Sequence, residues 1–250
     1  NSTHSWTGFE PSWSSSTLAQ TATTTGSWYL HVKGYNVEGI ENGNYDYGPY
    51  KYDSTAPVIS SLNDYGPYTD VTGQLHATWS GSDPESGCME YQYAIGTTPG
   101  NLGTVVPWTS TGTGTSFDTV GLTLNSGTTY YVGVKGQNGV GTWSTPTVSA
   151  GVTAADVVAS IIDAKKLADG KAVMLTDRVV SASFGSFYYI CEGQVDQVSG
   201  LRVGGGTPDP SQLADVSGIL DTINGERVLT SPYTVDTAGP GAPSPLFMVN

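Results

Sequence analysis

Two carboxylates in one short loop come closest to a chemical site in this chain. Asp83 and Glu85 lie within Gly81-Ser-Asp-Pro-Glu-Ser-Gly87, where the glycine and serine neighbours leave the backbone flexible. Paired carboxylates serve general acid–base chemistry or bind a hard cation such as calcium. A loop of this composition is also typical of a solvated turn. The sequence favours the turn, and it leaves Asp83 and Glu85 open as candidate calcium ligands.

The remaining polar residues do not form a catalytic set. The histidines His4, His31 and His76 are scattered, and the last two fall in strand-like alternation, which favours positions on a surface or rim. No spacing assembles a Ser-His-Asp triad or a phosphate loop. Cys88 and Cys191 form no C-x-x-C motif, so two separate thiols or one bridge between them are both open. We therefore predict that the chain is not an enzyme and needs no catalytic cofactor.

Composition narrows the class of partner and the compartment. The chain has 250 residues, with 9 basic and 22 acidic side chains and a net charge of -13, which repels phosphate backbones and anionic lipid surfaces. Only 12% of residues are charged and 33 are glycine, a balance suited to short strands and tight turns. Neither a membrane span nor a signal peptide is predicted. We expect an extracellular or cell-surface protein that binds no nucleic acid.

An internal repeat sets the size of the folding units. The segment Tyr29-Leu-His-Val-Lys-Gly-Tyr-Asn-Val-Glu-Gly39 recurs as Tyr131-Val-Gly-Val-Lys-Gly-Gln-Asn-Gly-Val-Gly141. The separation of about 100 residues suits a β-sandwich, and the alternation in each copy predicts a late strand. Residues 1–55 would then be only the C-terminal half of a sandwich. Such a half needs completion, either by a neighbouring domain of a tandem protein or by strands of another subunit.

The middle of the chain resembles a known family of β-sandwich domains. Residues 56–153 alternate short β-rich runs with turns, and the stretch Leu122-Thr-Leu-Asn-Ser-Gly-Thr-Thr-Tyr-Tyr-Val-Gly-Val134 resembles the corner between strands E and F of fibronectin type III domains. The resemblance implies that Tyr130 is the corner tyrosine, whose hydroxyl bonds to upstream backbone, and that Leu124 and Trp79 belong to the core. The residue that corresponds to Tyr130 in the first copy of the repeat is Trp28.

The segment between the two repeat copies also carries a resemblance. Tyr47-Gly-Pro-Tyr-Lys-Tyr-Asp-Ser-Thr-Ala-Pro57 is similar to the Asp-x-Thr-Ala-Pro junctions between tandem immunoglobulin-like domains of bacterial surface proteins. Acidic junctions of that kind often bind calcium, which makes Asp53 a candidate ligand. An unpartnered Asp in a turn is more often just a turn residue, since calcium requires six to eight oxygen atoms.

Residues 154–250 differ in pattern and predict a small barrel. Apolar residues at helical spacing predict one helix over Ala155–Leu167, and Asn224-Gly225 predicts a two-residue hairpin turn. Five strands are predicted at Ala172–Ser181, Phe184–Cys191, Gly200–Val203, Asp215–Leu220 and Glu226–Leu229. Together with Lys166-Leu-Ala-Asp-Gly-Lys-Ala-Val-Met-Leu-Thr-Asp-Arg-Val-Val180, these segments resemble OB-fold-like domains of large secreted bacterial proteins.

The OB-like resemblance implies a ligand surface on the second and third strands of the barrel. Alternation puts Phe187 and Tyr189 on one side and Tyr188 and Ile190 on the other. Phe187, Tyr189 and Arg202 are therefore the candidate ligand surface, for glycans rather than nucleic acid.

We expect, from these observations together, an all-β chain with a partial immunoglobulin-like sandwich, a complete fibronectin type III-like sandwich and an OB-like small β-barrel with one short helix. The favoured function is a non-catalytic structural or adhesive region of a multidomain bacterial surface protein, such as a subunit of a surface assembly or filament. The alternative is a carbohydrate-binding accessory region of a large secreted polysaccharide-active enzyme. A carboxylate hydrolase would require a pair of acids at defined spacing, which we do not find.

Overall fold

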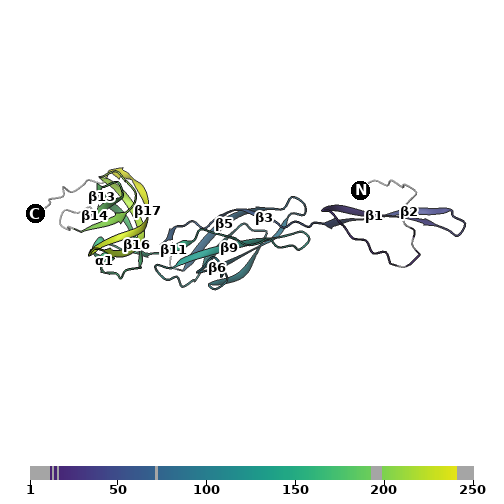
Figure 1. The fold of residues 1–250 in the computed structure, drawn as a ribbon, viewed down its shortest axis with the longest axis horizontal. Helices are drawn as coiled ribbons and strands as arrows, with labels where there is room; N and C mark the ends of the chain where they lie inside the picture. The colour runs from purple at the N-terminus through teal and green to yellow at the C-terminus, as the bar shows by residue number, and fades with distance from the viewer. Residues whose placement is uncertain (1–11, 13, 16, 71–72, 193–198, 241–250) are drawn as a thin grey trace, which may run out of the picture.

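The computed structural model describes residues 12, 14–15, 17–70, 73–192 and 199–240, with only the backbone at 235–240. Over these described residues the chain is all-β, as predicted, and the one helix among them is short. Three β units follow one another along the long axis of the molecule in chain order (Figure 1). They are a two-stranded hairpin, a two-sheet sandwich and a closed barrel, with their sheets formed by β1–β2, β3–β11 and β12–β17.

The first unit is an isolated antiparallel hairpin. Strand β1 (Gly26–Tyr35) pairs with β2 (Glu41–Tyr52), from Gly26 opposite Tyr52 to Tyr35 opposite Glu41. Neither strand contains a fully buried residue, and six of its aromatic side chains, those of Trp28, Tyr35, Tyr45, Tyr47, Tyr50 and Tyr52, are exposed. The indole N–H of Trp28 donates to the Thr24 carbonyl at 3.0 Å. Within the described residues the hairpin therefore has no core of its own.

The second unit is a fibronectin type III-like sandwich built around one apolar core. One sheet has the order β3-β5-β8, and the other has the order β4-β11-β9-β6-β7 with β10 paired to β9. The longer strands, such as β5 and β9, alternate along their length, and their buried apolar members face the opposite sheet. The bounds are β3 Val58–Asn63, β4 Tyr68–Thr69, β5 Gln74–Ser82, β6 Cys88–Gly96, β7 Val106–Gly112, β8 Ser116–Val120, β9 Thr129–Asn138, β10 Thr147–Val148 and β11 Val152–Ala154.

Five aromatic side chains contribute to that core. Tyr130 is 2% exposed, and its hydroxyl oxygen accepts a hydrogen bond from the backbone N–H of Asn125 at 2.8 Å. Trp79 packs edge-on against Tyr91, with ring centroids 6.0 Å apart, and Leu124 is also buried. The Tyr130 hydroxyl thus ties β9 to the loop that precedes it, while its ring fills the space between the sheets.

The third unit is a five-stranded barrel with a short strand and a helix before it. The strands close in the order β13-β14-β15-β17-β16 and back to β13, and only β15 and β17 within this ring are parallel. Residues Asn224 and Gly225, both at positive φ, connect β16 to β17 in the predicted two-residue turn. The bounds are β12 Asp156–Val157, α1 Ile161–Lys166, β13 Ala172–Ser183, β14 Phe187–Cys191, β15 Gly200–Gly204, β16 Gln212–Ile223 and β17 Glu226–Pro240.

The predicted helix over Ala155–Leu167 is wrong in its first half. Asp156–Val157 forms β12, which runs parallel to β13, and the backbone N–H of Val158 donates to the carbonyl oxygen of Met174 at 3.1 Å. β14 covers only the second half of β13, so the first half has an edge on which β12 satisfies its backbone groups. The helix starts only after Ser160, whose hydroxyl accepts the N–H of Asp163.

Two other expectations can be compared with the structure. Phe184, expected in the second strand of the barrel, lies before β14 and is exposed. Cys88 and Cys191 are both free thiols.

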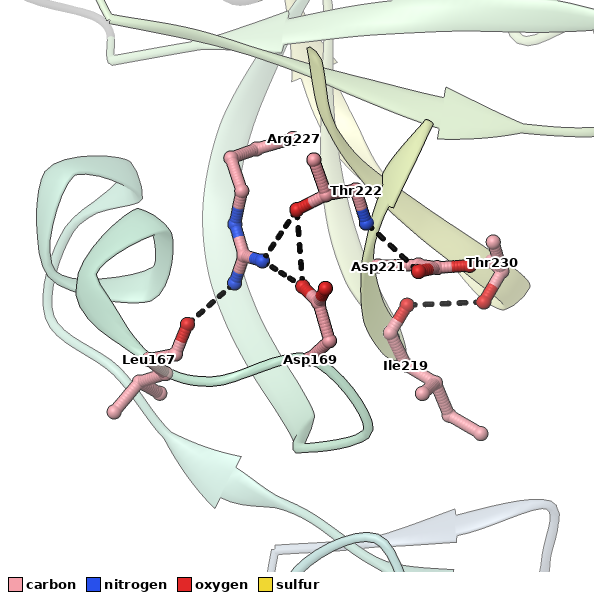
Figure 2. Close-up of polar contacts among 7 residues, drawn as sticks. All are labelled: Leu167, Asp169, Ile219, Asp221, Thr222, Arg227 and Thr230. Atoms are coloured by element: carbon pink, nitrogen blue, oxygen red, sulfur yellow. Dashed lines mark hydrogen bonds and ion pairs between the residues drawn. The ribbon is translucent and has the colours of Figure 1, made fainter. Parts of the chain in front are cut away.

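Two arginines hold the helix and its flanking loop against the barrel. Arg227 of β17 contacts the carboxylate of Asp169, the hydroxyl of Thr222 and the carbonyl oxygen of Leu167, which joins the loop after α1 to the β16–β17 hairpin (Figure 2). Arg178 donates to the carbonyl oxygen of Ala159 before α1 at 2.6 Å and pairs with Glu192 at 3.3 Å, with both charged side chains largely buried. Glu192 in turn accepts the backbone N–H of Ile161, the first residue of α1. Multiple donors on each planar guanidinium make such contacts possible from a single side chain.

Candidate functional site

The carboxylate of Asp53 is the centre of the joint between the hairpin and the sandwich. Its Oδ1 accepts hydrogen bonds from the backbone N–H and hydroxyl of Thr55, at 2.9 and 2.7 Å. Its Oδ2 accepts from the Ser86 hydroxyl at 2.7 Å and the Asn138 amide at 3.0 Å. These bonds, those from the side chains of Thr55 and Ser86 foremost, lower the pKa of Asp53 from 3.8 to about 2. Asp53 is therefore an anion at neutral pH, although it is 5% exposed.

The loop between β5 and β6 brings the second carboxylate to the same place. Oδ1 of Asp83 accepts the backbone N–H groups of Glu85 at 3.2 Å and Ser86 at 2.8 Å, so the side chain organises its own loop. Asp83 is only 7% exposed, and its Oδ2 is buried without a hydrogen-bond partner. The expectation of a solvated turn is therefore wrong for Asp83, because the segment that leaves β2 covers this loop. Glu85 remains exposed.

The three carboxylates that the sequence offered as calcium ligands meet in space. One carboxylate oxygen from each of Asp53, Asp83 and Glu85 lies within 4.8 Å of the other two. The Thr55 hydroxyl is 2.7 Å from Asp53 and 3.3 Å from Glu85, so a single hydrogen serves two acceptors. No salt bridge among the described residues involves any of the three. We call Asp53, Asp83 and Glu85 the acidic junction.

A second cluster lies on the outside of the barrel. Phe187 and Tyr189 of β14 face away from the core, where Tyr188 and Ile190 are fully buried. The central carbon of the Arg202 guanidinium lies over the Phe187 ring, 4.5 Å from the ring centroid. Phe184 stacks on Phe187 with ring centroids 5.1 Å apart.

The polar groups of this barrel cluster are already paired with one another. The hydroxyl of Tyr189 donates to Glu226 at 2.7 Å, and Arg202 lies 3.5 Å from the same carboxylate. The Glu226 contact raises the pKa of Tyr189. The structure thus brings together Phe187, Tyr189 and Arg202, and it adds Glu226, which lies too far along the sequence for strand alternation to associate it with them.

A third feature on the sandwich was not expected from the sequence. Lys135 of β9 lies between two indole rings, with its Nζ 4.6 Å from the centroids of both Trp108 and Trp143. Trp108 also borders a shallow depression of about 420 Å³ that includes Leu102 and Pro146. The only sequence signal was that Lys135 alternates with the buried Val132 and Val134 and must therefore face outward.

Comparisons with known proteins add little beyond the fold. No family model matches the chain, and no curated protein matches it. Among solved structures it is similar to the crystal structure of chicken CNTN1 FN1-FN3 domains, with a TM-score of 0.29 and 10% identity over 72% of this chain and 67% of that chain. In the part of the chain that the structure describes, the single helix is far shorter than a bilayer-crossing helix would be.

Proposed function

We propose that this chain is a non-catalytic, extracellular structural region whose complete sandwich holds its two neighbours at a fixed spacing. The observation that carries the proposal is that hydrogen bonds tie both ends of the sandwich to the adjoining units. At one end Asp53 accepts from Ser86 and Asn138. At the other, the Ser126 hydroxyl donates to Ala172 at 2.9 Å, and the Tyr68 hydroxyl donates to Ser231 at 2.7 Å.

Close backbone packing at the barrel end supports the same role. A Cβ atom on Gly127, in the sandwich, would lie 2.3 Å from the carbonyl oxygen of Gly170, in the barrel. Such a contact leaves no room for a side chain or a flexible spacer at that point. A joint that rests on backbone contact and several hydrogen bonds restricts relative motion more than a free linker would.

The hairpin exposes surface that a binding partner would cover. In the part of the chain that the structure describes, no third strand pairs with β1 or β2, and a row of tyrosines is exposed, so the hairpin offers apolar surface and backbone groups to a further strand. We infer that strands of a neighbouring domain or of another subunit complete this half-sandwich, as in a surface assembly or filament. Sedimentation velocity over a range of concentrations tests the subunit version, which requires self-association.

Distance measurements between spin labels test the spacer role directly. Labels at Tyr45→Cys in the hairpin and Ala168→Cys beside the barrel, in a background with Cys88→Ser and Cys191→Ser, report on both joints at once. We expect a single narrow distance distribution, nearly as narrow as that of a control pair at two exposed positions within the sandwich. A broad distribution spanning tens of ångströms would show that the joints are flexible and would refute the spacer role.

A carbohydrate-binding accessory region is the second candidate. It is favoured by the two half-buried indoles around Lys135, beside the depression that Trp108 borders, because binding pockets for small molecules are lined mainly by apolar and aromatic side chains. The barrel cluster supports it less, since Tyr189 and Arg202 are already turned toward Glu226. A glycan array and titrations at millimolar sugar, with Trp108→Ala as the comparison, test it. Binding that the substitution does not weaken, or no binding at all, removes this candidate.

The fold of the barrel also bears on the choice between a structural and a carbohydrate-binding function. Its closure order, with β15 and β17 as the single parallel pair of the ring, supports the resemblance to OB-fold-like domains. We infer an OB-like barrel that serves here as a neighbour for the sandwich to position. The acidic balance of the whole chain disfavours nucleic acid as its ligand.

A further inference from the structure

We propose that the acidic junction, formed by Asp53, Asp83 and Glu85, binds one calcium ion. The first observation is the convergence of three carboxylate oxygens within 4.8 Å of one another. Two of the three side chains are more than nine-tenths buried, so bulk water screens their mutual repulsion poorly. The repulsion in a cluster of this kind must be offset by hydrogen-bond donors, protons or positive charge.

The second observation is independent of that convergence and concerns a single atom. Oδ2 of Asp83 is buried and has no hydrogen-bond partner, whereas Oδ1 of the same carboxylate accepts two backbone N–H groups. Burying an oxygen of a carboxylate without a partner is costly, and native structures rarely leave such an atom unsatisfied. The atom therefore indicates a missing positive or hydrogen-donating partner at this position.

The neighbouring donors are already committed. The Thr55 hydroxyl is shared between Asp53 and Glu85, and the Ser86 hydroxyl donates to Asp53. The amide nitrogen of Asn138 donates to Asp53 and to the Thr55 carbonyl. Within the described ranges no lysine, arginine or histidine forms a salt bridge with the three acids. A cation from solution is thus the partner that satisfies Asp83 and also offsets the charge of all three groups.

The donor set selects calcium over other cations. All the candidate ligand atoms are carboxylate oxygens, which hard cations prefer, and no thiol or imidazole is among them. Calcium tolerates irregular coordination by six to eight oxygens, whereas magnesium requires a near-regular octahedron and retains its waters. Because Glu85 is exposed, water can supply the coordination positions that the three side chains leave open.

The placement of the site deepens the proposed function. Asp53 follows β2 of the hairpin, while Asp83 and Glu85 belong to the β5–β6 loop of the sandwich, so one ion would cross-link the two units. This consequence rests on the proposed spacer role, but the binding itself does not. A broad label distribution with intact calcium binding would refute only the spacer role, and a narrow distribution without binding would refute only the ion.

Isothermal titration of the full chain with calcium chloride, after chelator treatment and dialysis, tests the proposal. We expect one saturable site with a dissociation constant on the order of 10⁻⁴ M, as in extracellular modules, and at least tenfold weaker binding of magnesium. Asp83→Asn should weaken calcium binding at least tenfold. Asp118→Asn is the matched control, because it removes the same charge from an exposed carboxylate of the same sandwich, and it should leave the affinity unchanged.

Three outcomes would overturn the proposal. They are the absence of saturable heat up to about 10 mM calcium, equal weakening by Asp83→Asn and Asp118→Asn, and equal affinity for magnesium and calcium. If circular dichroism shows that Asp83→Asn does not fold, Glu85→Gln provides the comparison, because its exposed side chain makes no contact that organises the loop. Glu85→Gln should weaken binding by about threefold to tenfold, and an unchanged affinity would equally overturn the assignment.

Discussion

Replacing Tyr130 by Phe isolates the hydrogen bond at the corner of the sandwich. The substitution keeps the buried ring and removes only the hydroxyl that accepts the backbone N–H of Asn125 at 2.8 Å. A typical intramolecular hydrogen bond contributes about 1 kcal/mol, and an N–H left without its partner costs about 1–3 kcal/mol where water cannot replace it. The site is only partly buried, so we expect the free energy of unfolding to fall by about 1.5 kcal/mol.

Native-state hydrogen exchange read from peptides of β9 is the suitable assay, because it assigns the free energy to the sandwich while the other units remain in the chain. Tyr131→Phe is the control, since the neighbouring ring faces the other side of β9 and is half-buried. We expect that control to change the opening free energy by less than about 0.5 kcal/mol. Equal effects of the two substitutions, or no effect of Tyr130→Phe, would refute the reasoning that this hydroxyl holds the corner.

Three further predictions concern the barrel and its joint. Glu192→Ala removes the counter-ion of a largely buried guanidinium and the acceptor of the Ile161 N–H, and it should cost the barrel about 3 kcal/mol, measured by calorimetry. Gly127→Ala should destabilise the joint clearly more than Gly121→Ala does, as measured by thermal unfolding. Both glycines have positive φ, but only at Gly127 would an added Cβ lie 2.3 Å from a carbonyl oxygen. Hydrogen bonds from Lys166 and the capping Ser160 lower the pKa of Asp163 in the folded protein. The Asp163 carboxylate therefore stabilises the fold above the unfolded pKa of 3.8, and this stability is lost as pH falls through the lower folded pKa. In acid unfolding experiments, Asp163→Asn should lack that loss of stability.

The fold class followed from local patterns, because strand alternation and turn chemistry act over few residues. Asn224-Gly225 is an example, since a two-residue turn with both residues at positive φ needs these types whatever lies around it. The segment before the barrel shows the limit of this reasoning. Val158 fits a helical apolar stripe with Ile161 and Ile162 as well as it fits a strand, and only the edge of β13 that β12 pairs with, distant in sequence, decides between the two.

Site residues were harder to predict than strands, because their partners come from other elements. Nothing near Glu226 in the sequence associates it with Tyr189, and the register of the barrel brings them together. The burial of Asp83 has the same origin. Its loop has the composition of an exposed turn, and it is covered only because the segment around Asp53 crosses it.

The acidic junction is an unusual way to hold two units together if it works without an ion. Buried carboxylates lose hydration, and an apolar contact of similar volume would stabilise the joint at lower cost. The hydrogen bonds that Thr55, Ser86 and Asn138 donate to Asp53 account for one of the three acids. They do not account for Oδ2 of Asp83, which gains nothing from its position. A bound cation would give that oxygen a partner, and it would make the rigidity of the joint depend on the concentration of the ion, which a joint of apolar residues would not do.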